Sequence, residues 1–484
     1  MAQPLSELRN IRLKKLQELV NEGVNPYPAK AKRTHNIKTA LSSLNEEVVI
    51  VGRVRALRGH GNLFFMDVED SSGKMQIMVR KNNISPNEFD VVKKLDIGDF
   101  LSAGGKVFET KTGEITVDVT SIQLLSKSLR PLPDSWYGLK DAEARYRRRY
   151  IDMILNPEVK EKIITRSKII QKIREFLLKE GFVEVETPTL ETNASGALAS
   201  PFTTHIKAYD MDLFLRICMG ELWQKKLMVA GFEKTFEIGR AFRNEGVDRE
   251  HNPEFTMLEY YMAYADYEAN MEMQERLVGY VVKEATGNYK VTVGDKEIDF
   301  TPPYPRKKFR EVILEQTKTD IDAYETLEDL QKALKNYGFK IDPNWGRGHL
   351  IDEFYKEYVR PYLLGPLFLT HHPKDLKPLA KEDPDYPGYT QSFQLIANGF
   401  ELSNNYSELN DPIDQAERFA SQKALAKAGD DETMTSDEEF IEALEYGMPP
   451  VSGTGIGIDR LVALLTNSHH IREVIAFPLM KPKE

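Results

Sequence analysis

Cysteine is almost absent from this sequence of 484 residues, which contains only Cys218. A single thiol excludes an intramolecular disulfide and every zinc site that is built from several thiolates. Nothing in the sequence places a base beside this residue. We therefore expect Cys218 to be a small buried hydrophobic residue and not a nucleophile.

Long apolar runs are also missing. No uninterrupted stretch is long enough to cross a bilayer, and the segment that begins at Met1 lacks the apolar core and cleavage site of a secretory signal. Hydrophobic residues make up 41% of the chain and charged residues 29%, which is the composition of an ordinary globular protein. We therefore expect a cytoplasmic protein without a membrane partner.

The chain has no overall excess of positive charge. Its formal net charge of −10 argues against a protein that simply coats nucleic acid, so we expect no DNA partner. The charge is uneven, however, because residues 1–45 hold eight lysines and arginines against three acidic residues. Apolar residues recur there at roughly helical spacing, which predicts a basic helix over 5–20. This helix either packs on the next domain or contacts RNA, and the two roles are compatible.

The length predicts more than one domain. Hydrophobic periodicity and clusters of proline and glycine divide the chain into four parts. These are a basic helical extension at 1–45, a β-rich domain at 46–125, a linker at 126–150, and a mixed domain at 151–484 with a helical insertion near 285–380.

Residues 46–125 alternate apolar and polar side chains in five short runs that are separated by turns. Five strands in about 80 residues are typical of a small Greek-key barrel such as an OB-fold. Single-stranded nucleic acid requires aromatic and basic groups on an open strand surface, although an ordinary half-solvated sheet carries similar residues. The predicted outer face carries Arg53, Arg55, Phe65, Gln76 and Glu114, with Arg58 in the following loop.

The familiar phosphate-binding loops are not present. The chain lacks the G-x-x-x-x-G-K-[ST] pattern, and residues 453–457 have the wrong glycine spacing for a dinucleotide-binding fingerprint. Any nucleotide must therefore be held by a different arrangement.

Residues 235–261 are the most informative segment. They read as two strands around a loop, and Phe255, Glu259 and Tyr261 on the returning strand share one face beside Arg243. An arginine can neutralise a phosphate, an aromatic ring can stack on a base, and a carboxylate with a phenol can take a cationic group. An amphipathic hairpin with a surface ion pair would have the same pattern.

A strand followed by a helix is expected near the C-terminus. Residues 455–458 are apolar and rich in glycine, and we expect Asp459 to be the N-cap of a helix that carries Arg460. Glycines allow a flat base to approach the backbone, and Arg460 would project toward the same cavity. A tightly packed corner would need no arginine at this position.

Three segments resemble the motifs of class II aminoacyl-tRNA synthetases in the correct order. The run 242–246 with 251–255 resembles motif 2, 455–460 resembles motif 3, and the helix that leads to 185–188 resembles motif 1, which builds the dimer interface in that class. Within the class, 400–411, 261–267 and 443–450 are similar to lysyl-tRNA synthetases. The resemblance covers nearly the whole chain. It implies an α+β multidomain protein with an N-terminal OB-fold anticodon-binding barrel and a catalytic domain whose mainly antiparallel sheet is flanked by helices.

The resemblance also implies partners and residue roles. The partners are ATP, L-lysine, Mg²⁺ as cofactor, tRNA(Lys) and a second copy of the chain in a homodimer. Arg243 and Arg460 would be catalytic. The ATP-binding residues would be Arg243, Glu245, His251, Phe255, Glu401, Gly457 and Arg460; the lysine-binding residues Gly196, Glu221, Glu259, Tyr261, Asn404, Tyr406 and Glu408; the metal ligands Glu401 and Glu408; and the anticodon contacts Arg58, Phe65, Gln76 and Glu114.

This sequence departs from the family pattern at four places. Gln394 stands where the family commonly has a metal-binding glutamate, and Ser200 replaces a basic residue. The run 217–221 is one residue longer than usual, which bears on the role of Glu221. Tyr406 replaces a phenylalanine and adds a hydroxyl to the expected pocket.

Three other functions fit parts of the sequence. A synthetase for aspartate or asparagine shares the barrel, but Glu408 would repel a substrate carboxylate. A ligase that attaches lysine to a protein would have no need of the barrel. An RNA-binding protein without activity would have no need of Arg243, Phe255 and Arg460.

Overall fold

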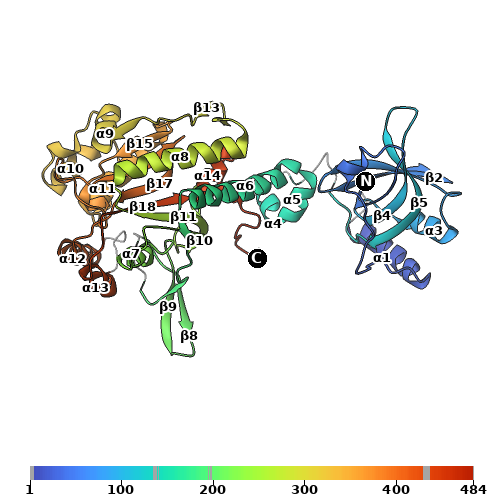
Figure 1. Ribbon diagram of the computed structural model, residues 1–484, viewed down its shortest axis with the longest axis horizontal. Helices are drawn as coiled ribbons and strands as arrows, with labels where there is room; N and C mark the ends of the chain where they lie inside the picture. Colours follow the sequence, from blue (N-terminus) through green and yellow to red (C-terminus); the bar gives the residue numbers. More distant parts are fainter. Residues whose placement is uncertain are drawn as a thin grey trace. The chain divides into compact units, whose positions relative to one another are not determined.

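The chain forms two compact units, residues 1–140 and 141–484, in the computed structural model (Figure 1). The described residues are 5–133, 139, 141–193, 196, 199–428 and 436–482. Residues 134–138 and 140, which belong to the expected linker, lie outside them. Among the helices of the described ranges, none has both the length and the apolar composition needed to cross a membrane.

The N-terminal unit is a closed five-stranded barrel in the order β1-β2-β3-β5-β4, which confirms the expected OB-fold architecture. Alternation places aliphatic residues such as Val54, Met66 and Ile77 in its core. The barrel elements are β1 (Glu47–His60), β2 (Leu63–Asp70), β3 (Gly73–Arg80), β4 (Phe100–Glu109) and β5 (Ile115–Ser126), with helices α1 (Leu5–Asn21), α2 (Ile37–Ala40) and α3 (Pro86–Lys94).

Helix α1 packs through a different face from the one its apolar spacing predicts. Leu5, Ile11 and Val20 are exposed, whereas Arg12 and Leu19 are buried. The Arg12 guanidinium donates hydrogen bonds to the carbonyl oxygens of Ser128 (3.0 Å) and Ile97 (3.1 Å). A buried cation therefore fixes the helix, because backbone carbonyls beyond the helix satisfy its donors.

The C-terminal unit is built on an eight-stranded sheet in the order β14-β15-β16-β17-β18-β11-β10-β6. Only the pairs β14–β15 and β10–β6 are parallel, so the expected, mainly antiparallel sheet is confirmed. Its strands are β6 (Val183–Glu184), β10 (Lys234–Phe242), β11 (Glu254–Ala263), β14 (Arg306–Lys308), β15 (Leu367–Thr370), β16 (Ser392–Ala397), β17 (Phe400–Ser407) and β18 (Val451–Gly457).

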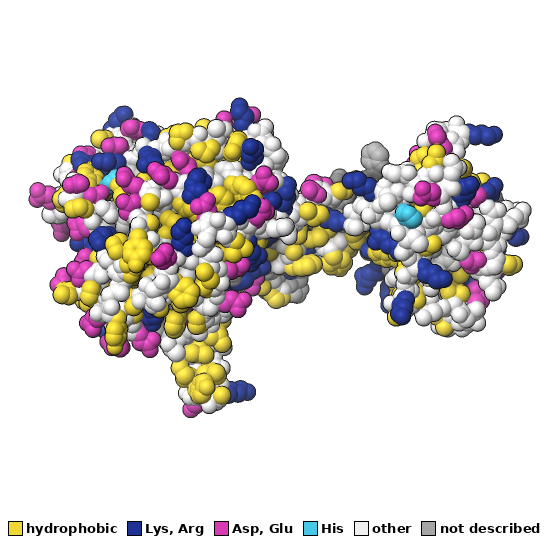
Figure 2. Space-filling view, in the orientation of Figure 1, with side chains coloured by type: hydrophobic (Ala, Val, Ile, Leu, Met, Phe, Trp, Pro, Cys, Tyr) yellow, Lys and Arg dark blue, Asp and Glu magenta, His cyan; other side chains and the backbone are white. Residues whose placement is uncertain are grey.

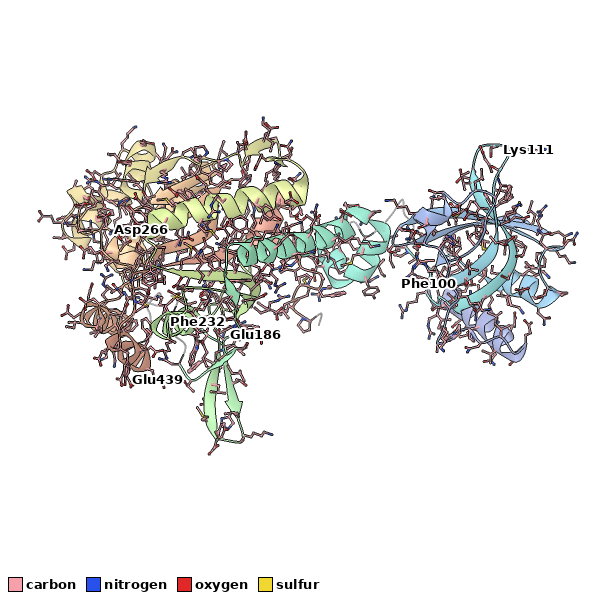
Figure 3. The ribbon with its side chains drawn as sticks, viewed as in Figure 1. Phe100, Lys111, Glu186, Phe232, Asp266 and Glu439 are labelled. Atoms are coloured by element: carbon pink, nitrogen blue, oxygen red, sulfur yellow. The ribbon has the colours of Figure 1, made fainter. Side chains whose placement is uncertain are left out.

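Helices cover one face of this sheet. Leu258 and Tyr260 of β11 join Ile456 of β18 in a core with residues of α6 and α8. The Asp266 side chain, labelled in Figure 3, caps α8 by accepting a hydrogen bond from the Ala269 N–H (2.9 Å). The helices of this unit are α4 (Ala142–Arg147), α5 (Arg149–Leu155), α6 (Pro157–Lys179), α7 (Glu221–Val229), α8 (Tyr267–Thr286), α9 (Phe309–Thr317), α10 (Leu327–Lys335), α11 (Arg347–Tyr358), α12 (Pro412–Ala428), α13 (Glu438–Glu445) and α14 (Ile458–Leu465).

Short elements complete this unit. One small sheet has the order β7-β9-β8, and a separate hairpin is formed by β12 and β13. Figure 2 shows hydrophobic side chains on the β8–β9 hairpin, whose turn carries Tyr209 at 76% exposure. These elements are β7 (Leu190–Glu191), β8 (Thr203–Ile206), β9 (Met211–Leu215), β12 (Lys290–Val293), β13 (Lys296–Asp299), η1 (Ile321–Ala323), η2 (Arg360–Tyr362), η3 (Lys374–Leu376) and η4 (Ile471–Val474).

The prediction that Asp459 caps the C-terminal helix is wrong. The helix begins at Ile458, and its N-cap is Gly457, two residues before Asp459. The Asp459 carboxylate accepts a hydrogen bond from the Thr256 N–H (2.8 Å) and pairs with Arg166 of α6. Contacts with Thr256 and Arg166, which are distant in the sequence, therefore outweighed the local capping preference of Asp459. These contacts tie α14 to β11 and α6.

A buried ion pair in the barrel unit gives a stability prediction. The Lys127 ammonium lies 2.7 Å from Asp99 and 2.5 Å from Asp96, and the Lys127 and Asp99 side chains are fully buried. Replacing Lys127 by methionine leaves a buried carboxylate without its cation, so we expect a loss of about 3–5 kcal/mol. Urea unfolding of the full chain measures this loss. The matched variant Lys93→Met, which breaks an exposed ion pair with Asp90, should change little, and equal effects would contradict the prediction.

Candidate active site

A cavity of about 700 Å³ lies on the sheet face opposite α6 and α8. Strand alternation directs Leu258 and Tyr260 into the helix-covered core, while Glu259 and Tyr261 face the cavity. Every residue expected to bind ATP or lysine lines this cavity. They are Gly196, Glu221, Arg243, Glu245, His251, Phe255, Glu259, Tyr261, Glu401, Asn404, Tyr406, Glu408, Gly457 and Arg460.

The cavity floor is organised in rows across the strands. One row runs from Gln394 through Asn404 and Gly455 to Glu259, which are paired in register on β16, β17, β18 and β11. The next row contains Tyr406, Gly453 and Tyr261. Register therefore unites residues that are more than a hundred positions apart.

Glycine in β18 gives the cavity its depth. A Cβ atom added at Gly453 would lie 2.1 Å from Glu408 Oε1 and 2.5 Å from a ring carbon of Tyr261. At Gly457, in contrast, an added Cβ would meet only carbons of Arg460 at 3.6 Å or more, which is ordinary contact. Gly453 is therefore the position where the absence of a side chain matters most.

One end of the cavity is acidic and buried. Glu221, Glu259 and Glu408 are buried there around the buried ammonium of Lys225. The Lys225 Nζ atom forms ion pairs with Glu408 Oε2 (2.6 Å) and Glu221 Oε1 (3.3 Å). The angles of the contact with Glu408 are not those of a hydrogen bond. The Tyr406 hydroxyl donates a hydrogen bond to Glu221. This contact gives a structural role to the hydroxyl that the usual phenylalanine would lack.

The acidic end contains three buried carboxyl groups and, in Lys225, one ammonium that pairs with two of them. Burial raises the pKa of Glu259 and Glu408 well above the usual carboxyl range, and the neighbouring Glu221 raises both further. Burial by itself would lower the pKa of Lys225, but Glu408 and Glu221 outweigh it and raise that pKa. Lys225 therefore stays charged, whereas Glu259 and Glu408 tend to hold protons until a second cation enters and favours their ionised forms.

Aromatic and cationic groups form the other end. The Arg243 guanidinium lies 5.3 Å from the centre of the Phe255 ring and donates a hydrogen bond to the Ile217 carbonyl (3.2 Å). Arg460 donates to the Glu401 carbonyl (3.0 Å), and its other terminal nitrogen lies 3.2 Å from His251 Nε2. One guanidinium group therefore lies beside an aromatic ring and a second lines the same cavity, an arrangement that suits a nucleoside triphosphate.

Glu245, which is exposed, and Gly196, which is buried, also line the cavity. Glu245 Oε1 accepts a hydrogen bond from the Ser200 N–H (3.2 Å), so it fixes the segment before the β8–β9 hairpin. Gly196 has a φ of +99°, and an added Cβ would lie 3.0 Å from the buried Cys218 sulfur and 3.5 Å from Glu221. Cys218 is thus part of the packing, and burial raises its pKa.

The two expected metal ligands differ in their surroundings. Among the described residues, no group of three or more His, Cys, Asp or Glu side chains is arranged to hold a metal ion. Glu408 is engaged by Lys225, so its surroundings do not fit a metal ligand. Glu401 lines the cavity beside Arg460, and a single carboxylate with phosphate oxygens and water is a common Mg²⁺ environment. Gln394 is buried, and its Oε1 atom has no hydrogen-bond partner among the described residues.

Sequence reasoning missed two lysines, one that lines the cavity, Lys377, and one buried behind its wall, Lys225. Lys225 follows Glu221 by four residues in α7, so helical spacing could have identified it. Lys377 lies just after η3 and has no local pattern that would mark it. Its Nζ atom donates a hydrogen bond to Asn404 Oδ1 (2.5 Å).

The expected anticodon contacts lie on the outside of the barrel. Arg58 belongs to β1 and not to the loop after it, and it pairs in register with Phe65 of β2. Gln76 pairs with Thr116 of β5, whose hydroxyl donates a hydrogen bond to Gln76 Oε1 (3.0 Å). Glu114 precedes Thr116 and is exposed.

Two other outer-face residues are already engaged. The Arg53 guanidinium lies 4.2 Å from the centre of the Phe100 ring, labelled in Figure 3, and Arg55 forms an ion pair with Glu69 (2.7 Å). They are therefore less available to a ligand than Phe65, which is partly exposed.

The buried Glu191 of β7 gives a pH-dependent prediction. Burial raises its pKa to about 7, opposed by the Trp223 hydrogen bond (3.1 Å) and by Arg216, and reinforced by Asp437 and Glu237. The folded chain therefore binds a proton that the unfolded chain releases, so stability falls as pH rises from about 4.5 to about 7. Glu191→Gln keeps the acceptor for Trp223 but cannot ionise. The difference in urea midpoint between about pH 5 and about pH 8 should be smaller in this variant, and an unchanged difference would contradict the assignment.

Comparisons with known proteins agree with this geometry. Residues 141–481 match the family described as tRNA synthetases class II (D, K and N), and residues 48–125 match the OB-fold nucleic acid binding domain. Proteins named lysine–tRNA ligase are similar over 99% of this chain in Moorella thermoacetica (48% identity, 99% of that protein) and in Pelotomaculum thermopropionicum (48%, 96% of that protein). A third, from Carboxydothermus hydrogenoformans, is 46% identical over 100% of this chain and 99% of its own length. The chain therefore belongs to the class II tRNA synthetases of the D, K and N group.

Proposed function

We propose that this chain is a lysine–tRNA ligase, which joins L-lysine to the 3′ end of tRNA(Lys) at the expense of ATP. The observation that carries the proposal is the acidic end of the cavity, where Glu221 and Glu408 pair with the ammonium of Lys225 and the buried Glu259 is a third acid. A substrate with an ammonium at the far end of its side chain supplies the missing positive charge. Aspartate would add a carboxylate, and asparagine would leave the charge unpaired.

The first step forms lysyl-adenylate. A lysine carboxylate oxygen bonds to the α-phosphorus of ATP, the bond from that phosphorus to the bridging oxygen breaks, and pyrophosphate leaves. Because this step needs alignment and charge neutralisation more than proton transfer, Arg243 and Arg460 are the proposed catalytic residues. In the second step a ribose hydroxyl of the tRNA attacks the lysyl carbonyl and releases AMP.

The nucleotide is held at the aromatic end of the cavity. Arg243 contacts the α-phosphate and the lysine carboxylate, and Arg460 with His251 faces the outer phosphates. Phe255 stacks on adenine, Glu245 lies near the adenine amino group, and Gly457 leaves room for the base. The adjacent Arg243 and Phe255 side chains and the contact between Arg460 and His251 support this arrangement.

Mg²⁺, when bound, would neutralise phosphate charge and orient the phosphate oxygens for displacement. Glu401 would hold it together with those oxygens, and Glu408 is assigned to the substrate amine. Because Gln394 is neutral, this chain offers one carboxylate fewer than the family pattern.

The substrate lysine extends along the rows of the sheet. Glu221, Glu259 and Gly196 take the α-amino group, and Glu408 with Tyr261 takes the side-chain ammonium. Asn404 and Tyr406 line the pocket between these groups. The depth above Gly453 supports this orientation, because it leaves a path from the Asn404 row to Glu408.

The remaining proposals concern tRNA, assembly and location. Arg58, Phe65, Gln76 and Glu114 on the barrel contact the anticodon, where stacking contributes about 1–3 kcal/mol per base.

The chain acts as a cytoplasmic homodimer. Exposed apolar residues on and beside the edge strand β6, namely Val183 (48%), Leu190 (49%) and Phe232 (41%), support a contact with a second copy.

ATP–pyrophosphate exchange with individual amino acids tests the main proposal. Exchange should be driven by lysine, and it should be much weaker with ornithine, arginine, aspartate or asparagine. Exchange driven by aspartate or asparagine but not by lysine would overturn the assignment. Binding of tRNA without any exchange would show a protein that only binds RNA.

Glu408→Gln tests the far end of the pocket. A neutral amide cannot pair with the substrate ammonium, so kcat/KM for lysine should fall about 10- to 100-fold, as loss of a charged hydrogen bond predicts. The control Glu297→Gln removes a carboxylate that pairs with Lys290 on the β12–β13 hairpin and should leave exchange unchanged. A variant that charges lysine normally would remove Glu408 from the binding site.

Gly453→Ala tests the depth of the pocket. Its methyl group would displace the Glu408 carboxylate and the Tyr261 ring, so the affinity for lysine without ATP should fall by about tenfold or more. Gly457→Ala on the same strand meets only ordinary contacts and should bind lysine as the parent does. Calorimetry measures both affinities, and equal losses would contradict the geometric argument.

A further inference from the structure

Lys377 has an incompletely satisfied charge inside the cavity. The residue is buried, and its ammonium donates one hydrogen bond, to the neutral side-chain oxygen of Asn404 (2.5 Å). In the described part of the chain its Nζ atom has no further hydrogen bond and no ion pair with a carboxylate. An ammonium carries three donors, so two remain for a ligand. Burial lowers the pKa of Lys377, and Lys356 lowers it further, whereas Glu401, Asp352 and Glu221 raise it.

Three polar, uncharged side chains line the cavity together with Lys377. Gln394 pairs in register with Asn404, and its buried Oε1 atom has no hydrogen-bond partner within the described residues. The same holds for Nε2 of buried His372. Burial and then Lys377 lower the pKa of His372 well below its usual value, so this ring is neutral. Lys377 is therefore the one cation of this cluster, which we define as Lys377, Asn404, Gln394 and His372.

The spacing of the rows matches the length of a lysine molecule. The Glu408 carboxylate reaches over Gly453, and the Asn404–Gly455 row lies two residues away, a distance of about 7 Å along the strand. An extended lysine spans about 6 Å from its side-chain nitrogen to its α-carbon. A substrate ammonium at Glu408 therefore brings the α-carbon to the row that contains Asn404, beside Lys377.

We propose that Lys377 binds the carboxylate of the substrate lysine from the β17 side of the pocket, opposite Arg243. The inference rests on the proposed lysine pocket and adds a specificity-determining residue to it. The substrate carboxylate accepts hydrogen bonds from the buried Lys377 ammonium, and Asn404 keeps the ammonium directed into the cavity. The pocket then recognises both ends of the amino acid. The acidic residues bind its two amino groups, and Lys377 distinguishes lysine from a diamine or an amide of the same length because only lysine carries a carboxylate.

Calorimetry with L-lysine and L-lysinamide, without ATP or Mg²⁺, tests the proposal. The two ligands differ only in the carboxylate, so the ratio of their affinities reports the contact. Lys377→Met should reduce this ratio about 10- to 100-fold, mainly through weaker binding of lysine. Lys377→Gln, which can still bond Asn404 but lacks the charge, should do the same and serves if the methionine variant does not fold.

The matched control is Lys381→Met. Lys381 also donates a hydrogen bond to an asparagine oxygen, that of Asn410 (2.6 Å), but it does not line the cavity. Its removal should leave the ratio unchanged. A folded Lys377 variant with the parental ratio would overturn the proposal, as would one that loses affinity for a non-hydrolysable ATP analogue and not for lysine. If Glu408→Gln also leaves the binding of both ligands unchanged, the lysine pocket itself is wrong, which separates the two failures.

Discussion

The acidic end of the cavity depends on one buried ion pair, between Lys225 and Glu408. Three carboxylates in a buried site would repel one another if no cation were present, and burial favours their protonated forms. Lys225 neutralises part of this charge and leaves the remainder for a ligand. Because α7 places Lys225 one turn beyond Glu221, a single helix supplies both an acid and the cation that keeps the site acidic but stable.

Strand β18 keeps the cavity continuous from its acidic end to its nucleotide end. Gly453, Gly455 and Gly457 carry no side chains, so the cavity passes from Glu408 to Arg460 without interruption. Asp459 then secures this strand–helix corner to β11 and α6 through Thr256 and Arg166. One continuous segment, residues 453–460, therefore determines both the depth of the pocket and the position of Arg460. Partners that are distant in the sequence hold this segment in place.

The barrel unit also uses buried cations, in this case to fix the segments that pack against the barrel. Lys127 with Asp99 and Asp96, and Arg12 with backbone carbonyls, place buried cations where the N-terminal helix and the end of β5 meet the barrel. The outer strands remain free to carry Phe65 and Arg58. In both units, buried charge specifies which segments pack together, while apolar burial supplies the core.

The sequence by itself determined the barrel, the antiparallel hairpin and the shared face of Phe255, Glu259 and Tyr261, because strand alternation and turn residues act locally. It also identified Arg243, Arg460 and Glu408 through family motifs. The sequence did not reveal the packing face of α1, the role of Asp459 or the position of Lys377, since each depends on a partner far away in the chain. Only the tertiary structure decided that Lys225 pairs with Glu408 and that Gln394, Asn404 and Lys377 meet, because strand register and loop packing, not local pattern, bring these groups within hydrogen-bonding distance or into one row.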